Sequence, residues 1–402
     1  MPVDLMIQGQ GPIALALEVL LAAQGWDLPI RRTQRLPPAT ETLSNRAMAL
    51  SAGSLQLLGR CLRALPDGAD IHTVEVQVAG LGTWGGGTGR GMPGEVRRSG
   101  VHSVRMRAHD LGLERLGRVV FWGELTKALG EAPRPALPSP TLDAGEACWT
   151  VQVQADGDPG EDAVTGDSGQ SALVAALRSD RFPRAWALER FLPEGPLALL
   201  PDPRPGHLQL VWCAPQAITQ GRLDRMQHAP GEVLGELQRA VAPEVELRGW
   251  AGPATGVAIR RRARRRLVEH DQGRRASTVW IGNAAQILHP VAGQGLNLGL
   301  RDAAELARTL ADLLASLRFR PEGATVCAAL EAYAGRREPD RRALMALTDH
   351  LASATTGRLF QALAPLGLLA MKGCTPVRRG VAGLFAFGPA GLGRWAGCYD
   401  AA

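Results

Sequence analysis

The chain lacks the features that define several common protein classes. Its six cysteines, Cys61, Cys148, Cys213, Cys327, Cys374 and Cys398, show no paired spacing. This scatter argues against a disulfide framework and against a zinc site, so we expect no metal. Only 4% of the residues are aromatic, and no helix-turn-helix or zinc-finger pattern accompanies the basic ones. We therefore expect no nucleic-acid partner.

Long apolar runs are also missing. No segment approaches the roughly 18 uncharged residues that a membrane-spanning helix needs, and no signal peptide opens the chain, so we predict a cytoplasmic protein. The net charge is +6, and the basic run Arg260 to Arg266 could contact anionic lipid, although a solvated face explains it equally well. In the tail, apolar stretches flank Lys372 and Arg378-Arg379. This pattern fits peripheral attachment to the inner face of the membrane, but on the residues alone an interdomain or dimer contact fits it slightly better.

The most informative segment present runs from Trp280 to Asp302, WIGNAAQILHPVAGQGLNLGLRD. A short apolar strand leads into Gly282-Asn283-Ala284-Ala285, where small side chains let a ligand approach the backbone. Apolar residues then recur at three- and four-residue steps, which predicts a helix that begins near Gly295. Its first N–H groups would face the loop and suit an anionic or electron-rich ligand. A turn that uses glycine for geometry alone is the alternative, which the interleaved polar residues disfavour.

The amino terminus carries a second glycine motif. Leu5 to Ile7 predicts a strand and Leu15 to Ala23 a helix, and Gly9, Gly11 and Ala14 between them form a GxGxxA pattern. Dinucleotide-binding units place a pyrophosphate at the start of such a helix. The pattern is weak when it occurs alone, and a chance pair of glycines is the alternative. Its place at the start of the chain and the loop downstream favour the dinucleotide.

Together these segments resemble the FAD-binding motifs of the ubiquinone-biosynthesis hydroxylases, which are single-component aromatic flavoprotein monooxygenases. The run Asn283-Ala284-Ala285-Gln286 and the following Leu288-His289-Pro290 are most similar to the branch that hydroxylates 2-polyprenyl-6-methoxyphenol. The resemblance implies FAD as cofactor and NAD(P)H as a transient co-substrate. It also implies hydroxylation of a polyprenyl phenol with O2 through a flavin hydroperoxide, in ubiquinone biosynthesis. Because such a phenol resides in the bilayer, the resemblance favours peripheral attachment of the protein to the membrane. Another ring position or another phenol is the alternative within this class.

The fold implied by the resemblance is α/β, like that of para-hydroxybenzoate hydroxylase. A Rossmann-like FAD-binding domain would be interleaved with a mostly antiparallel β-sheet substrate domain, followed by C-terminal helices. At 402 residues the chain is long enough for two cores. We expect the FAD-binding domain at residues 1–75, 105–180 and 275–325, the substrate domain at 76–104 and 181–274, and helices over 326–402. Residues 187–201 resemble the family strand that lines the substrate cavity.

The resemblance also assigns site residues. Those expected to bind the cofactor are Gly9, Gly11, Ala14, Gln34, Arg46, Asp167, Asn283, Gly293, Gln294, Gly295, Leu296 and Asn297. Pro290 is expected beside the flavin ring. His289 is expected to orient the substrate or shuttle a proton, with a hydrogen-bonded loop histidine as the alternative.

Several positions depart from the family pattern. Gln34 stands where an acidic residue is usual, and Asn45, Ser168 and Val174 replace an aspartate, a glycine and an arginine. The family's Asp-Gly pair matches either Asp167 or Asp156-Gly157, and we favour Asp167 because Asp156 lies in a sequence typical of an exposed turn. These departures leave a second class open, a flavin-poor, non-catalytic subunit of a lipid-associated biosynthetic complex.

Overall fold

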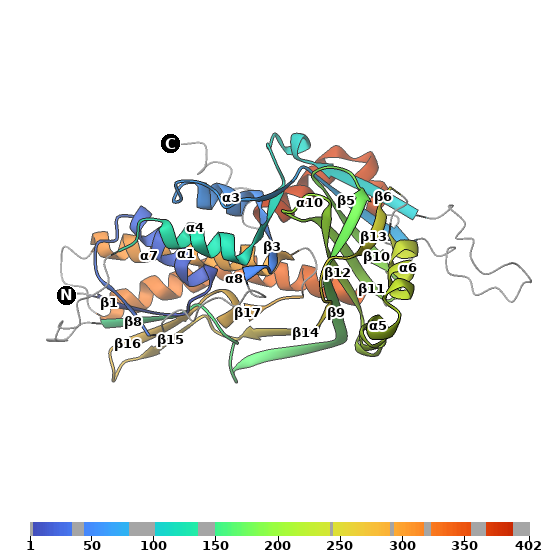
Figure 1. The fold of residues 1–402 in the computed structure, drawn as a ribbon. Helices are drawn as coiled ribbons and strands as arrows, with labels where there is room; N and C mark the ends of the chain where they lie inside the picture. Colours follow the sequence, from blue (N-terminus) through green and yellow to red (C-terminus); the bar gives the residue numbers. More distant parts are fainter. Residues whose placement is uncertain are drawn as a thin grey trace, which may run out of the picture.

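The first lobe of the molecule is built on a five-stranded sheet (Figure 1). The computed structural model describes residues 3–33, 44–79, 101–135, 149–241, 244–289, 293–316, 323–354 and 367–388. In sheet order, the strands are β15 (Val268–Asp271), β16 (Ala276–Trp280), β8 (Trp149–Gln154), β1 (Val3–Gln8) and β2 (Ile30–Arg32). The last four run parallel, and β15 pairs antiparallel with β16. A parallel core of this kind is the setting in which dinucleotides bind at the carboxyl ends of strands.

Helices cover this sheet and form the largest core. They are α1 (Pro12–Ala23), α4 (Trp122–Glu131), α7 (Gln294–Ser316) and α8 (Gly323–Ala354). Helix α1 is buried along almost its whole length because apolar residues occupy all of its faces. It packs against α7, and the core they share includes Leu17, Leu306 and Tyr333. The helix after the first glycine motif and the helix after the second therefore lie against each other.

The second lobe is a nine-stranded, mostly antiparallel sheet. In sheet order, its strands are β17 (Gln286–Ile287), β14 (Thr255–Arg264), β9 (Ala163–Arg181), β12 (His207–Pro215), β11 (Gly195–Pro201), β10 (Trp186–Leu192), β5 (Thr73–Ala79) and β6 (Val101–Arg107), while β13 (Glu246–Trp250) pairs with β9. Helices α5 (Gln216–His228) and α6 (Pro230–Ala240) pack on one face of it. With the first lobe, this sheet confirms the expected α/β architecture.

Smaller elements connect the two lobes. A three-stranded sheet contains β3 (Ala47–Ser51), β7 (Gly117–Phe121) and β4 (Gly68–Ile71). Helix α3 (Ala52–Gly59) follows β3, and the short helices η1 (Ala108–Leu111) and η2 (Gly282–Ala284) follow β6 and β16. Near the carboxyl end, α10 (Thr375–Phe387) packs on α3 and η1. Along the described chain, α8 and α10 make up much of the C-terminal part.

One expected domain boundary, at residue 180 between the nucleotide-binding and substrate domains, differs in the structure. Residues 163–180 were predicted in the nucleotide-binding domain, but β9 pairs with β12, β13 and β14 and so belongs to the nine-stranded sheet. Strand β9 has 19 residues, long enough to reach from one lobe into the other. Its first half is polar and exposed and its second half is apolar, but the whole strand pairs within one sheet, so this change in composition does not mark a domain boundary.

The basic run on β14 does not form one charged patch. Strand alternation sends its side chains to opposite faces. Arg264 is buried with its guanidinium against Glu269 and over the Trp280 ring, and Arg262 pairs with Asp158. Because two of the six arginines are paired within the chain, the run gives less support to an anionic surface contact than its sequence suggested.

Candidate functional site

The loop between β1 and α1 is closed tightly on itself. Gly9 has a φ of +148°, and a Cβ there would lie 3.1 Å from Asp156 Cγ and 3.2 Å from Ala14 Cβ. Gly11 donates its N–H to Asp156 Oδ2 at 2.5 Å, and Gln10 donates to the same oxygen. Because Asp156 follows β8, the neighbour of β1, its carboxylate lies at the positive end of α1. The three predicted residues Gly9, Gly11 and Ala14 are thus brought together.

The contact with Asp156 reverses our preference between the two Asp-Gly candidates. Asp156 is half-buried and holds the glycine loop, whereas we had interpreted it as part of an exposed turn. Asp167 is exposed on β9, opposite Arg260, and its Oδ1 accepts a local bond from Gly169 N. The sequence favoured Asp167 because Asp156 lies among residues typical of an exposed turn. The structure favours Asp156 because β8 lies beside β1, and this pairing is not visible in the sequence.

The second glycine motif closes on the first. Gly282 has a φ of +57°, and a Cβ on it would lie 3.2 Å from Ile13 side-chain carbons. On α7, a Cβ at Gly299 would meet Ile13 Cδ1 at 2.8 Å and Gly282 Cα at 3.1 Å. Glycines at both positions let the η2 turn, α1 and α7 approach within backbone contact. Asn283, between them in sequence, is exposed on η2.

The first turn of α7 is tied to β3 through Asn297, which is 2% exposed. Its Oδ1 accepts bonds from Ser51 N at 2.8 Å and Ser54 Oγ at 2.7 Å, and its Nδ2 donates to Ala49 O and Gly293 O at 3.0 Å. The amide of Asn297 is therefore fully engaged by protein groups. It would act on a cofactor by fixing the loop rather than by touching the ligand.

Of the other predicted residues near the start of α7, Leu296 and Gln294 are packed against the protein, whereas Gly295 has free space beside it. Leu296 packs against the main core, and Gln294 donates to Phe385 O at 3.3 Å, which docks α10 on this turn. Gly293 has a φ of +57°, whereas a Cβ at Gly295 would meet nothing within 4 Å. Arg46 is exposed just before β3. The glycine-lined side of this turn is open to a ligand, and its opposite side is packed.

A buried ion cluster lies behind the η2 turn. Asp302 accepts from Gly282 N at 3.2 Å and from Gln286 Nε2 at 2.8 Å, while its other oxygen accepts from Arg337 Nε at 2.8 Å. Arg337 and Arg301 both donate to Asp340, at 2.7 and 2.9 Å. Burial raises the pKa of Asp340, but the two arginines outweigh it and lower that pKa overall. The cluster links α7 and α8 to the backbone of the glycine turn, and we did not predict it.

His289 lies where the cofactor loop meets the nine-stranded sheet. It is 3% exposed, and its Nε2 lies 3.3 Å from Gln170 Oε1 on β9. Burial lowers the pKa of His289 to about 4, so the ring is neutral at pH 7. A neutral ring whose Nε2 carries the proton can donate to Gln170. The predictions for Pro290 and Gln34 lie outside the described residues.

Replacing His289 with glutamine should reduce the acid sensitivity of the fold. Folding lowers the pKa of His289 from 6.5 to about 4, so between these values the unfolded chain binds a proton that the folded chain does not. The folded protein therefore becomes less stable as pH falls from 6.5 towards 4. The glutamine variant lacks that titration, so its melting temperature should fall less between pH 6.5 and 4. The same substitution at the exposed His109 serves as the control. Equal acid sensitivity in both variants and the native chain would contradict a buried neutral His289.

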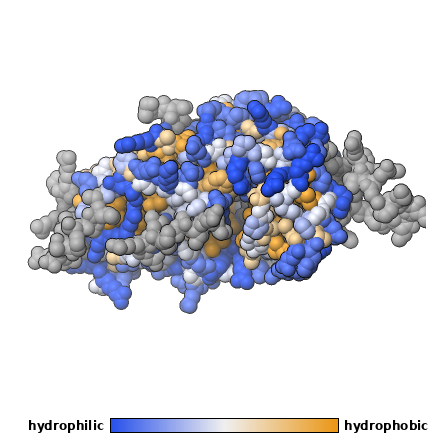
Figure 2. Space-filling model, in the orientation of Figure 1, coloured by the Kyte–Doolittle hydropathy of each residue, from blue (hydrophilic) through white to orange (hydrophobic). Residues whose placement is uncertain are grey.

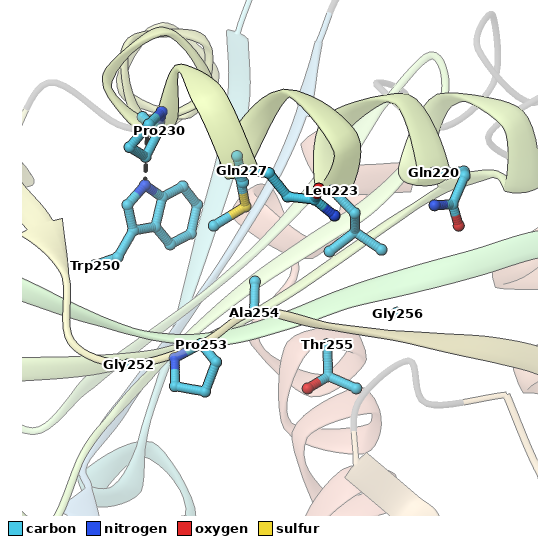
Figure 3. Close-up of a pocket in the computed structure, with 11 residues that line it drawn as sticks. Gln220, Leu223, Gln227, Pro230, Trp250, Gly252, Pro253, Ala254, Thr255 and Gly256 are labelled. Carbon is cyan, nitrogen blue, oxygen red and sulfur yellow. Dashed lines mark hydrogen bonds between the residues drawn. The ribbon is translucent and has the colours of Figure 1, made fainter.

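A hollow of about 550 Å³ lies elsewhere, between α5, the start of α6 and β14 (Figure 3). Leu223, Trp250 and Pro253 line it, and Trp250 Nε1 donates to Pro230 O at 3.1 Å. It belongs to the α5–α6 face of the sheet. Thr255, at its edge, is seven residues along β14 from the Arg262 that pairs with β17, which corresponds to roughly 23 Å. This hollow is therefore separate from the glycine loops.

The surface carries scattered apolar residues. Figure 2 shows hydrophilic residues around the rim of one face and hydrophobic ones along its middle and over the lobe that contains α5 and α6. Leu369 and Val377, near the carboxyl end, are 50% and 45% exposed. Among the described residues, no helix is long and apolar enough to cross a membrane.

Comparison with known proteins agrees with this geometry. A family model described as an FAD binding domain matches residues 227–347. The ubiquinone hydroxylase UbiL of Rhodospirillum rubrum is 35% identical over 216 residues, which cover 52% of this chain and 45% of that protein. The 3-demethoxyubiquinol 3-hydroxylase of Escherichia coli is 29% identical over 174 residues, covering 42% of this chain and 40% of that protein. The chain thus aligns with less than half the length of these curated relatives.

Solved structures share the fold. PqsL from Pseudomonas aeruginosa, described as a probable FAD-dependent monooxygenase, has a TM-score of 0.64 at 19% identity, covering 92% of this chain and 100% of that one. The p-nitrophenol 4-monooxygenase PnpA from Pseudomonas putida has a TM-score of 0.61 at 16% identity, covering 96% of this chain and 99% of that one. These matches and the family model together support FAD as the cofactor.

Proposed function

We propose that this chain, which is similar to ubiquinone-biosynthesis hydroxylases over less than half of their length and to an FAD binding domain, hydroxylates the ring of a polyprenyl phenol, with 2-polyprenyl-6-methoxyphenol as the leading candidate. NAD(P)H and O2 would be its co-substrates. The observation that carries this proposal is the convergence of the two glycine loops on Ile13, next to a helix start whose Gly295 side is open. Aromatic hydroxylation in another position is the alternative within the same class.

The residues present fit an FAD. The β1–α1 loop, with Gly9, Gly11 and Ala14, would hold the pyrophosphate, and the first N–H groups of α7 would face the flavin. Asn283, on the η2 turn, and Arg46, just before β3, are both exposed, and we propose that they contact the cofactor. When bound, FAD supplies the redox chemistry that inserts one oxygen atom of O2 into the ring. The chain itself then has to position the substrate, exclude water and manage protons.

His289 would take part as a neutral residue. Its burial and its contact with Gln170 fix the ring at the junction of the cofactor loop and the sheet. A neutral imidazole at this place can exchange hydrogen bonds with a water or with another part of the substrate without placing a positive charge beside an electron-rich ring. We propose that it orients the substrate, and that Pro290 lies beside the flavin.

One observation favours a second function, a flavin-poor subunit of a lipid-associated complex. The Asp156 carboxylate accepts the N–H groups of Gln10 and Gly11, which are the donors that a pyrophosphate would use. An FAD would have to displace or accommodate that negative charge. The exposed Leu369 and Val377, near Lys372, would suit a peripheral contact with membrane or with such a complex.

Spectra and turnover separate the two functions. We expect purified protein to show a flavin spectrum after incubation with FAD, and to oxidise NADPH in proportion to the hydroxylated short-chain prenyl methoxyphenol formed. Mass spectrometry of the product made under ¹⁸O₂ should show one labelled oxygen. Failure to bind FAD at high concentration would favour the non-catalytic subunit. Bound FAD with NADPH oxidation that yields only peroxide would mean that the phenol is not the substrate.

A further inference from the structure

One face of the nine-stranded sheet carries a row of partly accessible side chains. The row crosses five strands and consists of Val76, Glu189, Ala198, Val211 and Val174, which are cross-strand partners of one another. Cross-strand partners point to the same side of a sheet. Their sequence neighbours Leu188, Leu199, Leu210 and Ala175 point to the opposite side and are at most 4% exposed. The two faces differ, because α5 and α6 seal only the second one.

The accessible face is also the one that meets the cofactor loop. Along β9, Gln170 and Ala172 lie on the same side as Val174, since they follow at two-residue steps through an unbroken ladder. Gln170 is the residue that contacts His289. Val174 therefore lies roughly 13 Å along β9 from the junction with the glycine loop, and Glu189 lies three strands away from Val174, roughly 14 Å across the sheet. Short side chains such as Ala172 and Ala198 lie between that junction and Glu189.

Glu189 is the only charged member of this row. Within the described residues, no hydrogen bond or ion pair engages its carboxylate. Glu75, on the neighbouring strand β5 but on the sealed face, accepts from Gln77, Arg105 and Trp186. The sheet thus provides hydrogen-bond donors for the carboxylate of Glu75. It leaves the carboxylate of Glu189 without one among the described residues, on the face that meets the cofactor loop. An unpartnered carboxylate is costly unless a ligand or a proton compensates it.

The surroundings of Glu189 are apolar. The side chains that face it from β5 and β11 carry no charge, and Leu368 and Met371 from the C-terminal segment cover Val76 beside it. From β12 the Cys213 thiol is near enough that, after burial, Glu189 is the second cause of its raised pKa. Burial alone raises the pKa of Glu189 from 4.5 to about 8. A carboxyl group in this state exchanges protons close to physiological pH.

We propose that Glu189 is the proton acceptor for the hydroxyl group of the phenol, which binds on this face of the sheet. The proposal rests on the function proposed above and adds a catalytic residue to it. The O–H bond of the phenol breaks, its proton passes to a Glu189 carboxylate oxygen, and the electron pair stays on the phenolate oxygen. The phenolate is the more electron-rich ring and the better nucleophile. The proton returns to solvent or product after the ring has reacted.

The acid strengths suit this transfer. A phenol has a pKa near 10 and an ordinary glutamate one near 4.3, so the proton transfer would be unfavourable by about six pK units. With the pKa of Glu189 at about 8, the mismatch falls to roughly two units. General bases matched in this way typically contribute about 10²–10⁴-fold to rate. Burial at an apolar face thus makes a carboxylate strong enough to act on a phenol.

The test is the pH dependence of kcat/KM for Glu189→Gln in FAD-loaded protein. In the native chain, kcat/KM should rise with pH and level off above about pH 8, where Glu189 is ionised. In the glutamine variant this rise should disappear and kcat/KM at pH 8 should fall at least about 100-fold, while FAD affinity is unchanged. Glu189→Asp should keep the pH-dependent rise with a lower plateau. Asp180→Asn, which alters an exposed pair with Arg248 where β9 meets β13, away from Glu189 on β10, should leave the profile unchanged.

Stability measurements separate a folding defect from a catalytic one. When the pKa of a carboxyl group is raised from 4.5 to about 8 by folding, the folded protein becomes less stable as pH rises through that interval. Glu189→Gln should therefore melt higher than the native chain at pH 8 and show no gain at pH 4.5. Native turnover with an unaltered rate and pH profile in the glutamine variant would overturn the role of Glu189 alone. If the FAD-loaded native chain hydroxylated no phenol, the proposed function would fail as well.

Discussion

Arg337→Met should destabilise the fold by about 3–5 kcal/mol, because it removes the centre of a buried ion cluster and leaves its carboxylates without their main partner. Arg337 is 2% exposed, and it bridges Asp302 to Asp340. Methionine fills a similar volume, so loss of charge rather than a cavity would cause the effect. Urea unfolding followed by circular dichroism measures it.

A neighbouring arginine supplies a matched control. Arg336 lies next to Arg337 on α8 and pairs with Glu305, and its side chain is 36% exposed. Arg336→Met should cost no more than about 1 kcal/mol, as partly exposed pairs usually do. Because Asp302 also holds Gly282 N and Gln286, Arg337→Met should weaken FAD binding in the fraction that stays folded. Equal losses in the two variants would mean that the cluster has no special part in the fold.

The elements that sequence predicted well are those in which the pattern is local. The glycine spacing at Gly9 and Gly11 and the apolar steps after Gly299 specify a strand, a turn and a helix within a short window. Local backbone requirements of this kind, such as the positive φ at Gly282, are written directly in residue type. The architecture followed from these segments and from the family resemblance.

The features that the sequence could not predict depend on contacts between strands and helices that are distant along the chain. The choice between Asp156 and Asp167 is made by the adjacency of β8 and β1, and the ion cluster by the packing of α8 against α7. Glu189 was in a segment expected to line the substrate cavity, yet nothing in its neighbours showed which face it occupies. An apolar strand interrupted by Glu189 and Arg190 is the signal that could have found it, since strand alternation sends these two neighbours to opposite faces and leaves the glutamate to be paired or protonated on its own.

The arginine run shows the opposite error. Read as a string, Arg260 to Arg266 indicates one basic surface. On β14 the alternation of a strand divides the side chains between two faces, and Arg264 becomes a core residue stacked on Trp280. Charge density along a sequence is therefore a weak guide to charge density on a surface when the segment is a strand.

Gly295→Asp should abolish FAD binding, weakening it by at least about 100-fold, or roughly 2.7 kcal/mol, while the chain stays folded. A side chain at this position meets nothing in the protein, and a carboxylate in the first turn of α7 is favourable for the helix itself. The loss would come from bulk and negative charge on the open side, where the reduced flavin needs donors. Gly335→Asp, at an exposed and equally open glycine of α8, is the control. Flavin absorbance after gel filtration reports occupancy and thermal melting of the apoprotein reports folding. A folded Gly295→Asp variant with native FAD content would place the flavin elsewhere.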